Sequence, residues 1–427
     1  MADRSRGGAL KRRVFVRGRG AITPLGETWP ASRDALAEGR SAVAPVQHFD
    51  VEGYPSQVAA TVPFPLGAWG LRSDKPSYAP KPPLDEAEDR RLALARRAAD
   101  EAWAEARVSA APSRIGVFVG AESGRATYRT IFALSRAAGG GARFDHARFG
   151  EDARALATAV HAAAVSPAAV ASALAARIGA EGPVETISLA CASGAAAIVS
   201  ATQAIRLGLC DVALAGGVGA DVDPFMLVGF GLLGALSARG VSCPFDLRRD
   251  GFVVGEGAAF VVLAAERGDA RAEVAGAART LDAFHLTAPD QAGDGAERAM
   301  RGALDDAGRV AIGYVQAHGT STQLNDAVEA AAIRRTLGDA LPNVHVGAVK
   351  GAVGHWVAGA GAIGFLCALE AVEGGICLPT AGLTEPDPAC VLPHVVGAAK
   401  RKPVEAALVN AFAFGGANTS LVVSRCA

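Results

Sequence analysis

Residues 187–217, ISLACASGAAAIVSATQAIRLGLCDVALAGG, constrain the fold more than any other stretch of the chain. The short apolar run at 187–190 predicts a buried strand, and the small residues after it predict a helix as far as Gly208. A second apolar run at 212–215 predicts the next strand. Cys191 therefore lies where a strand passes into a helix. Unpaired amides and the helix dipole favour a thiolate there, although a lone cysteine in an apolar segment is more often a small buried side chain.

The rest of the chain alternates between short apolar runs and longer helical patterns. Strands are expected at residues 14–17, 115–120, 258–263, 314–317, 345–349, 407–410 and 421–423, with another beginning at Arg271. Helices are expected at residues 29–38, 85–106, 166–178, 297–308, 326–337 and 354–372. Residues 40–84 are expected to be irregular and 121–165 to form a helical excursion. This alternation predicts an α/β fold with largely internal strands.

A faint internal repeat indicates that the fold is a duplication. Gly194 is followed by AAAIVSATQAIRLGLC, which ends at Cys210, and Gly361 by AIGFLCALEAVEGGIC, which ends at Cys377. The spacing is the same in both segments. Each is preceded by an apolar strand, a short glycine-containing turn and a reactive residue type, cysteine or histidine. Two such halves would stack two sheets with a pair of helices buried between them.

Composition and charge exclude several classes of function. The chain has 427 residues and a net charge of −1, which favours neither nucleic acid nor an anionic membrane as a partner. Its seven cysteines include no CxxC pair, which argues against a disulfide framework or a metal site and favours a reducing, cytoplasmic location. The basic N-terminus lacks the apolar core of a secretory signal. The uncharged windows 187–205 and 351–369 are expected to be buried core helices of a soluble protein.

Three segments of the second half have the character of loops at the carboxyl ends of strands, where α/β folds place their sites. The first carries His318, Thr320 and Thr322 and suits a polar ligand. The alternative is that these hydroxyl residues only belong to the turn before the next helix, with Asn325 or Asp326 as its N-cap.

The second segment carries Lys350 and His355. A buried lysine needs a counter-ion, and Glu329 is the natural candidate; a lysine that reaches out to solvent is the alternative. The third segment is the turn 411–418, whose glycines can aim backbone N–H groups at a ligand oxygen. A cysteine at a helix start with two histidines on separate loops can carry out acyl transfer, by thiolate attack on a thioester with imidazole donors for a second carbonyl.

These segments resemble, in order and spacing, the motifs of the elongating β-ketoacyl-acyl carrier protein synthases. The resemblance is carried by the Cys191 turn, PFDLRRDGFVVGEGA at 244–258, FHLTAPD at 284–290, HGTST at 318–322, VKGAVGH at 349–355 and AFAFGGAN at 411–418. It implies the thiolase fold, an α/β architecture of five layers, αβαβα, with two repeated halves. Residues 1–265 would form the half with the nucleophilic cysteine, and residues 266–427 the half with the two catalytic histidines.

The resemblance also implies a role for each site residue. Cys191 would accept the acyl chain, and His318 and His355 would hydrogen-bond the thioester carbonyl of a malonyl unit during decarboxylation. The amides of Cys191 and Phe414 would form an oxyanion hole, with Phe414 gating access to the cysteine.

Further residues are implied to support this chemistry. Lys350, paired with Glu329, would hold the His355 loop and the local field in place. Ala413 stands where the family commonly has glycine, which would make the gate stiffer. The residues implied to bind substrate are Thr320, Thr322, Gly415 and Gly416, the two threonines through the phosphopantetheine arm.

The implied activity is decarboxylative Claisen condensation, which extends an acyl chain by two carbons from malonyl-acyl carrier protein in fatty acid, polyene or polyketide synthesis. No metal is implied, and no cofactor apart from the phosphopantetheine of the carrier protein. The other implied partner is a second subunit, in a homodimer or in a heterodimer with a subunit of the chain-length-factor type. The acidic carrier protein is expected to meet a basic patch, for which the candidates are Arg90, Arg91, Arg248 and Arg249, the last two with a structural role as the alternative.

Two other functions are less favoured by the sequence. A non-catalytic partner subunit of the chain-length-factor type would lack the active cysteine, whereas this chain has Cys191, His318 and His355 together. A degradative thiolase would have a second reactive cysteine near the C-terminus, and Cys390 and Cys426 lie outside any matching motif.

Overall fold

The computed structural model describes residues 11–63, 89–124, 128–139, 141–156 and 165–426. The elements of the first half are β1 (Phe15–Ile22), α1 (Trp29–Ala37), β2 (Ala44–Pro45), β3 (Val58–Ala59), α2 (Arg90–Ala106), β4 (Ile115–Gly120), α3 (Tyr128–Ala137), α4 (His146–Leu156), α6 (Ala169–Ile178), β5 (Val184–Ile187), α7 (Ser193–Arg206), β6 (Val212–Ala220), α8 (Pro224–Leu232) and β7 (Glu256–Ala264).

The elements of the second half are β8 (Ala272–Leu281), α9 (Asp294–Asp306), β9 (Tyr314–Gln316), α10 (Gln323–Leu337), β10 (His345–Gly347), α11 (Lys350–Val353), α12 (Ala360–Gly374), β11 (Ile376–Cys377), β12 (Lys400–Arg401), β13 (Ala406–Phe412) and β14 (Ala417–Arg425). The α/β alternation predicted from the sequence is confirmed. The parts of the predictions for 40–84, 85–106 and 121–165 that fall at 64–88, 125–127, 140 and 157–164 lie outside the described residues.

The sheet shows the duplication directly. Its strand order is β10-β9-β13-β14-β8-β1-β7-β6-β4-β5. Each half places its main strands in the same order, and each has the same parallel and antiparallel pairings, such as β4 parallel to β5 and β6, and β9 parallel to β10 and β13. Two separate sheets were expected. The halves are instead joined at one edge, where Phe15 of β1 pairs with Glu273 of β8.

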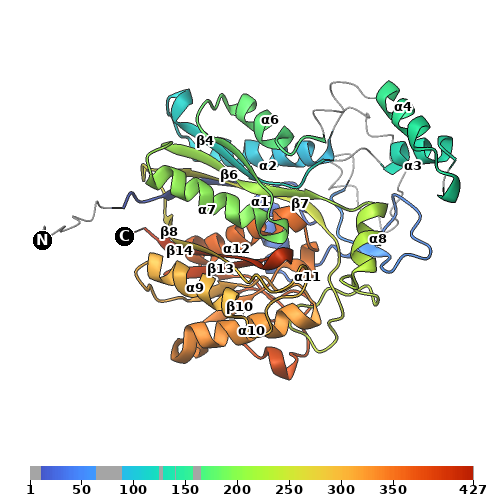
Figure 1. Cartoon of the computed structure of the whole chain (residues 1–427). Helices are drawn as coiled ribbons and strands as arrows, with labels where there is room; N and C mark the ends of the chain where they lie inside the picture. Colours follow the sequence, from blue (N-terminus) through green and yellow to red (C-terminus); the bar gives the residue numbers. More distant parts are fainter. Residues whose placement is uncertain (1–10, 64–88, 125–127, 140, 157–164, 427) are drawn as a thin grey trace, which may run out of the picture.

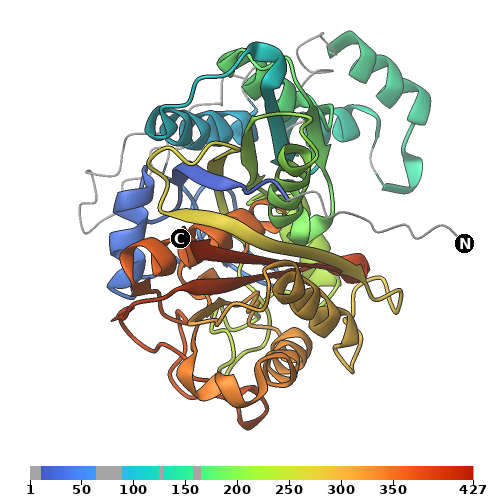
Figure 2. The same cartoon turned by 90° about the vertical axis from the view of Figure 1, so that its left-hand side faces the viewer.

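The elements form five layers, which can be followed from top to bottom in Figure 1 and from the side in Figure 2. Helices α2 and α6 cover the outer face of the first half, and α9 and α10 cover the outer face of the second. Helices α7 and α12 lie between the two halves of the sheet. These are the five layers, αβαβα, that were expected.

The two central helices contact each other through glycine. A Cβ atom on Gly361 of α12 would lie 2.7 Å from Cβ of Ala195, and one on Gly194 of α7 would lie 3.1 Å from Cβ of Ala362. Because Gly194 corresponds to Gly361 in the repeat, the two contacts are the same contact seen from each half. The pair of helices is therefore related by approximate twofold symmetry, and the contact begins three residues after Cys191.

The repeat also shows which positions correspond around that turn. Ala190 and Val357 occupy equivalent positions, and both have a left-handed backbone, with φ of 45° and 46°. The position equivalent to Cys191 is consequently Ala358, and His355 lies three positions before it.

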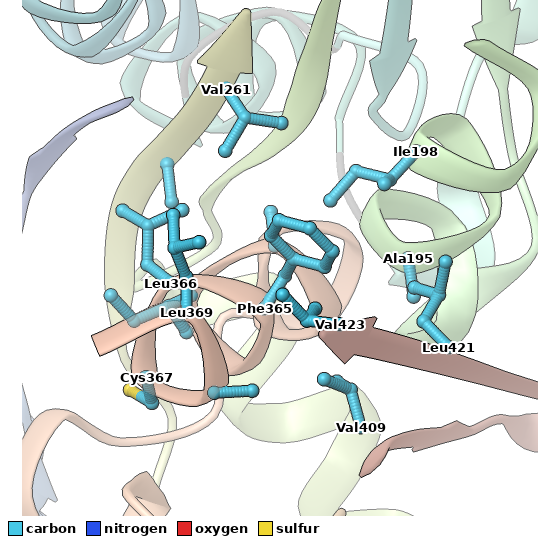
Figure 3. Packing of buried hydrophobic residues seen from close by; sticks show 14 of the residues in the cluster. Ala195, Ile198, Val261, Phe365, Leu366, Cys367, Leu369, Val409, Leu421 and Val423 are labelled. Atoms are coloured by element: carbon cyan, nitrogen blue, oxygen red, sulfur yellow. The ribbon is translucent and has the colours of Figure 1, made fainter. Parts of the chain in front are cut away.

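The core is built mainly around α7 and α12. Figure 3 shows Phe365, Leu366 and Leu369 of α12 packed against strands from both halves, with Ile198 of α7 nearby. Phe365 has no exposed surface, and burying an aromatic side chain of this size contributes about 2–3 kcal/mol. Small residues elsewhere in the two helices let them approach, while the larger ones fill the space above and below.

The helical run Val357–Gly374 is long and apolar enough to cross a membrane by length and composition, and 89% of it is buried inside the fold. Among the described residues it is the one run of this kind. The prediction that the uncharged window 351–369 is buried in the core is confirmed, but the window is not one helix, because α11 ends at Val353 and α12 begins at Ala360.

Two boundaries near the site differ from the prediction. The apolar run 187–190 was expected to be a buried strand, but β5 ends at Ile187 and is the last strand of the sheet, with Val184 41% exposed. The helix expected at 354–372 begins only at Ala360, because His355 and its neighbours form an extended bridge and a turn before it.

Candidate active site

Cys191 lies in a tight turn between β5 and α7. The hydroxyl of Ser193 fixes the turn, because it donates to the carbonyl of Ala190 (2.6 Å) and accepts from the amide of Leu189 (2.8 Å). The cysteine is 7% exposed. The same chain segment therefore supplies both the nucleophile and the rigid backbone that holds it.

Burial controls the state of this thiol. It raises the pKa of Cys191 to about 11, against the opposing effects of the Lys350 charge and of a hydrogen bond from the amide of Phe414. The expectation of a stabilised thiolate at the helix start is wrong for the resting site, where the thiol is protonated at neutral pH. The amide of Cys191 itself also points at the sulfur. Two backbone donors thus meet at the atom that would attack.

His318 and His355 lie together although they come from separate loops. His318 follows β9 and His355 follows α11, and their ring centroids are 5.8 Å apart with the planes at 85°. Phe412 packs against His318, with 5.6 Å between centroids, and Phe252 packs against His355 at 5.0 Å. These two aromatic neighbours keep water away from the imidazoles and limit their rotation.

Both imidazoles are neutral and carry their proton on Nε2. Burial, assisted by the charge of Lys350, holds the pKa of each ring well below its usual value. Nδ1 of His355 accepts from the amide of Val357 (3.2 Å), and Nδ1 of His318 accepts from the ammonium of Lys350 (3.2 Å). A neutral ring whose Nδ1 accepts must have its proton on Nε2. Each histidine is therefore fixed as an N–H donor.

Lys350 and Glu329 support His318 separately. The ammonium of Lys350 donates to the backbone carbonyl as well as to Nδ1 of His318. Glu329 accepts from the amides of His318 and Gly319, both at 2.8 Å, and from the side chain of Asn410. The expected direct ion pair is wrong: the two residues act on each other through their charges, and the loop that they hold is that of His318.

Burial also sets the protonation of this pair. It lowers the pKa of Lys350 to about 8 and raises the pKa of Glu329 to about 6. The charge of Glu329 opposes the shift of Lys350, and the amides that donate to Glu329 oppose the shift of Glu329. Both groups are consequently charged in the interval between those two values.

Asp326 is a supporting residue whose role the sequence did not reveal. It was considered only as an N-cap, but α10 begins at Gln323 and Asp326 lies inside its first turn. The buried carboxylate accepts from the amides of Thr320 (2.9 Å), Ser321 (3.1 Å) and Phe245 (2.8 Å). It therefore ties the His318 loop to the loop that follows Cys243. The available signal was an acidic residue one helical turn before Glu329, on the same helix face.

Thr320 and Thr322 lie in the loop directly before α10. Their hydroxyl groups are 2.8 Å apart, and Thr320 also contacts Asp326. Both line the same cavity as Cys191 and the two histidines. They present polar groups on the side of the cavity that is formed by the start of α10.

The turn between β13 and β14 delivers one amide to the cysteine. Gly415 and Gly416 have φ of 82° and 77°, conformations that favour glycine. Their own N–H groups are already used, for the carbonyls of Leu286 (2.7 Å) and Ala413 (3.1 Å). The expectation that these glycine amides face a ligand is therefore wrong, and the donor that reaches the sulfur is Phe414. Ala413 is extended, with φ of −142°, so alanine causes no strain there.

A second loop, residues 282–290, is hydrogen-bonded to this turn. Asn418 donates to the carboxylate of Asp282 (2.7 Å), and the amide of Asp282 donates to the carbonyl of Gly416 (2.9 Å). With the bond from Gly415 to Leu286, three contacts join the two loops. Any movement of Phe414 must therefore involve the loop 282–290.

One cavity of about 380 Å³ brings these groups together. Its lining includes Cys191, both histidines, Phe414 and the two threonines, with Phe230, Leu233 and Phe252 on an apolar side. Another cavity, of about 410 Å³, lies between β1, α1, α2 and the end of α12 and is lined largely by ion-paired arginines and glutamates. It contains none of the predicted site residues.

The expected basic patch for a carrier protein is not formed by the four arginines proposed. The side chains of Arg90, Arg91 and Arg249 are 12%, 10% and 6% exposed, and Arg248 is the one that is largely open to solvent. Each of the four is paired within the chain: Arg90 with Glu256, Arg91 with Asp89, Arg248 with Asp246 and Arg249 with Asp387. Arg90, Arg91 and Arg249 therefore hold the fold together, and the prediction that they belong to an exposed basic patch is wrong.

Comparison with known proteins agrees with this geometry. The models for the N-terminal and C-terminal domains of beta-ketoacyl synthase match residues 11–268 and 271–384. The 3-oxoacyl-acyl carrier protein synthase 2 of Rhizobium meliloti (strain 1021) is 34% identical, over 97% of this chain and 99% of that protein.

Solved structures show the same fold. A type II polyketide acyl carrier protein in complex with its ketosynthase bound to the hexaketide matches with a TM-score of 0.83 and 27% identity, over 97% of this chain and 100% of that one. The ishigamide ketosynthase/chain length factor matches with a TM-score of 0.82 and 31% identity, over 98% and 100%. The five layers are therefore those of the thiolase fold. The chain belongs to the β-ketoacyl synthase family, the condensing acyltransferases of fatty acid and polyketide synthesis.

Proposed function

We propose that this chain extends an acyl group held on Cys191 by condensing it with a malonyl unit. The observation that carries the proposal is the meeting of Cys191, His318 and His355 in one cavity, with both imidazoles fixed as N–H donors. In this assignment the nucleophile belongs to the half at residues 1–265 and the histidines to the half at 266–427.

In the first step, the sulfur of Cys191 attacks the carbonyl of an acyl thioester on the phosphopantetheine of a carrier protein. A carbon–sulfur bond forms to Cys191, and the thiol of the carrier leaves with a proton. Because the resting thiol has a pKa of about 11, negative charge on sulfur needs stabilisation as it forms. Lys350 and the amide of Phe414 supply it.

In the second step, a malonyl thioester occupies the emptied site. The Nε2–H groups of His318 and His355 donate to its thioester carbonyl, which becomes an enolate as the terminal carboxylate leaves as carbon dioxide. Neutral imidazoles suit this step because they stabilise the developing oxyanion without forming an ion pair with the carboxylate that must depart. Phe252 and Phe412 exclude water that would protonate the enolate carbon.

In the third step, the enolate carbon attacks the carbonyl of the acyl group on Cys191. The oxyanion accepts from the amides of Cys191 and Phe414. The bond to Cys191 then breaks, the sulfur regains a proton, and a β-ketoacyl thioester longer by two carbons remains on the carrier. Thr320 and Thr322 are proposed to hold the phosphopantetheine arm, because their hydroxyl groups line the cavity beside the histidines.

The proposed partners follow from the substrates and from the similar structures. We infer that an acyl carrier protein delivers both thioesters, and that the chain pairs either with a second copy or with a subunit of the chain-length-factor type. We also infer a cytoplasmic location, which suits the free, buried thiols of six of the seven cysteines. A chain-length-factor role for this chain itself is disfavoured because its nucleophile and both histidines are in place.

Intact-mass spectrometry tests the first step. The purified protein is given a panel of acyl-carrier thioesters, beside a Cys191→Ala control. The proposal expects an acyl adduct on the wild type alone, either from the single chain or after a chain-length-factor-type partner is added. An equal adduct on the Cys191→Ala variant, or none under either condition, would contradict it.

A further inference from the structure

Asn410 is the one polar residue of β13, whose sequence is AALVNAF, and the three steps above leave its side chain unused. Strand β13 runs parallel to β9, with Val409 beside Gln316, so Asn410 lies next to the start of the loop that carries His318. Side chains alternate along a strand, so Asn410 and Phe412 leave β13 on the same face. Because Phe412 packs against His318, that face is the one turned toward the His318 loop.

The side chain of Asn410 is buried, at 3% exposed, and fully hydrogen-bonded. Ser420 lies opposite it on β14, and its hydroxyl donates to Oδ1 (2.9 Å). This bond fixes which way the amide points. Nδ2 consequently faces the other way, where it donates to Oε1 of Glu329 (3.2 Å) and contacts Sδ of Met300 (3.3 Å). An amide with three defined partners in the core is held in one orientation.

Glu329 is the link between Asn410 and the histidine. Its Oε1 accepts from the amide of His318 as well as from Asn410, and its Oε2 accepts from the amide of Gly319. An ionised carboxylate can accept at both oxygens, whereas the protonated acid carries an O–H that donates and leaves fewer positions for N–H donors. The hydrogen bond from Asn410 therefore favours the form of Glu329 that holds the His318 loop.

The charge of Glu329 is finely balanced. Burial raises its pKa to about 6, Asp326 on the same helix raises it further, and the hydrogen bonds from the two amides and from Asn410 lower it. The charged group that faces Glu329 from α11 is Lys350, whose own pKa is raised by this carboxylate. His318 is neutral. Because the carboxylate titrates close to neutral pH, the loss of one hydrogen bond is enough to change how much of it is ionised.

We propose that Asn410 is a positioning residue for His318, which acts by donating to Glu329 and so keeps that carboxylate ionised while it holds the His318 loop. Ser420 supports this role by fixing the direction of the amide. The same side chain ties the His318 loop to the hairpin that carries Phe414, so the donors of the second and third steps share one buried connection. The proposal rests on the proposed function, since it concerns the decarboxylation step.

The test measures carbon dioxide release from malonyl-carrier protein over a series of pH values. The wild type should lose activity as the pH falls through about 6, where Glu329 becomes protonated. In Asn410→Ala the midpoint of this loss should move to higher pH by roughly one unit, because a hydrogen bond to a charged group is removed. Ser420→Ala keeps the donor but frees the amide to turn, so its midpoint should move in the same direction by less.

The matched control is Thr202→Val, which removes a buried hydroxyl of α7 that donates to the carbonyl of Ile198 (2.8 Å). Its midpoint should stay at that of the wild type. A merely structural role would slow carbon dioxide release by the same factor at every pH. That result for Asn410→Ala with normal melting, or an equal shift in Thr202→Val, would overturn the inference.

Two further outcomes are decisive. If Asn410→Ala does not fold, an unshifted midpoint in Ser420→Ala would overturn the inference, and a shifted one would support it. No carbon dioxide release from the wild type at any pH, alone or with a chain-length-factor-type partner, would instead overturn the proposed function.

Discussion

Lys350 and Glu329 carry the charges that act most directly on His318, and burial moves the pKa of both toward neutrality. The pKa of Lys350 is about 8 and that of Glu329 about 6. Between these values the lysine donates to Nδ1 of His318 and the glutamate accepts its amide. The hydrogen bonds that hold His318 are therefore complete only near neutral pH, and we expect the proposed decarboxylation step to be fastest in that range.

The buried lysine predicts a specific pH dependence of stability. Its folded pKa of about 8 lies below the ordinary 10.5, so between these values the unfolded chain binds more protons than the folded one. Stability contributed by this group therefore rises as the pH increases through that window. Relative to Lys350→Met, the free energy of unfolding of the wild type should rise by about 3 kcal/mol between the two pH values.

This prediction is checked by denaturant unfolding of both proteins at a series of pH values. Lys400→Met, at an exposed lysine, is the control and should show no such rise relative to the wild type. A difference between the wild type and Lys350→Met that stays flat, or that falls as the pH increases, would contradict the assignment.

At the scale of residues, the sequence predicts which side chains lie at the site better than it predicts the groups that they bind. Cys191, both histidines, Lys350 and Glu329 all lie at or beside the cavity. The direct ion pair was wrong because spacing along the chain reveals charged groups but not the backbone amides and carbonyls that they will bind. The low pKa expected for the thiol failed for a related reason, since burial is a property of the folded chain.

At the scale of elements, the hairpin of β13 and β14 and the loop 282–290 act as one unit around Phe414. Asn418 is 4% exposed and donates to both Asp282 (2.7 Å) and the carbonyl of Gly416 (3.1 Å). Asn418→Ala should leave Asp282 and that carbonyl without this partner, at a cost of about 1–3 kcal/mol. The amide of Phe414 would then be less well aimed at Cys191.

The expected result for Asn418→Ala is a lower melting temperature and slower acylation of Cys191. The matched control is Asn325→Ala, which removes a side-chain bond to Asp326 (3.2 Å) on the other side of the cavity. It should leave the acylation rate close to that of the wild type. If the two variants acylate equally fast, the hydrogen bonds between the loop 282–290 and the β13–β14 hairpin do not position Phe414.

The elements themselves show where sequence patterns succeed. Internal strands such as β4 and β7 were predicted closely because they are continuous apolar runs buried on both faces. The edge strand β5, with the sequence VETI, has no such run, so a strand was predicted instead at the apolar run 187–190. Ile187 and Leu189 of that run pack against the main core, and a pattern of hydrophobicity cannot distinguish such residues from a strand.

At the scale of the whole molecule, the duplication brings Cys191 and the two histidines into one cavity. Cys191 comes from the first half and both histidines from the second, and α7 and α12 must pack closely for them to share one cavity. The spacing of Gly194 and Gly361 predicted the repeat. It could not predict that the two halves join into one sheet, because that depends on a single pairing between β1 and β8.

The contact between the central helices can be tested with two glycines of α12. A Cβ on Gly361 would lie 2.7 Å from Ala195, whereas one on Gly364 would have its nearest neighbour at 3.5 Å. Gly361→Ala should destabilise the protein by about 1–3 kcal/mol through overpacking and slow acylation by displacing the Cys191 turn. Gly364→Ala should be neutral or stabilising by up to about 1 kcal/mol. Equal melting temperatures for the two variants would show that the helices do not depend on this contact.

The proposed roles of Cys191 in acyl transfer and of His318 in decarboxylation are tested most directly by measuring both reactions in the same preparations. Acyl transfer to the protein is followed by intact mass, and carbon dioxide release from malonyl-carrier protein is followed separately, for the wild type, Cys191→Ala and His318→Ala. We expect Cys191→Ala to form no adduct yet still release carbon dioxide. We expect His318→Ala to form the adduct but to release carbon dioxide roughly a hundredfold more slowly. Loss of both reactions in Cys191→Ala with normal melting, or unchanged release in His318→Ala, would contradict the account.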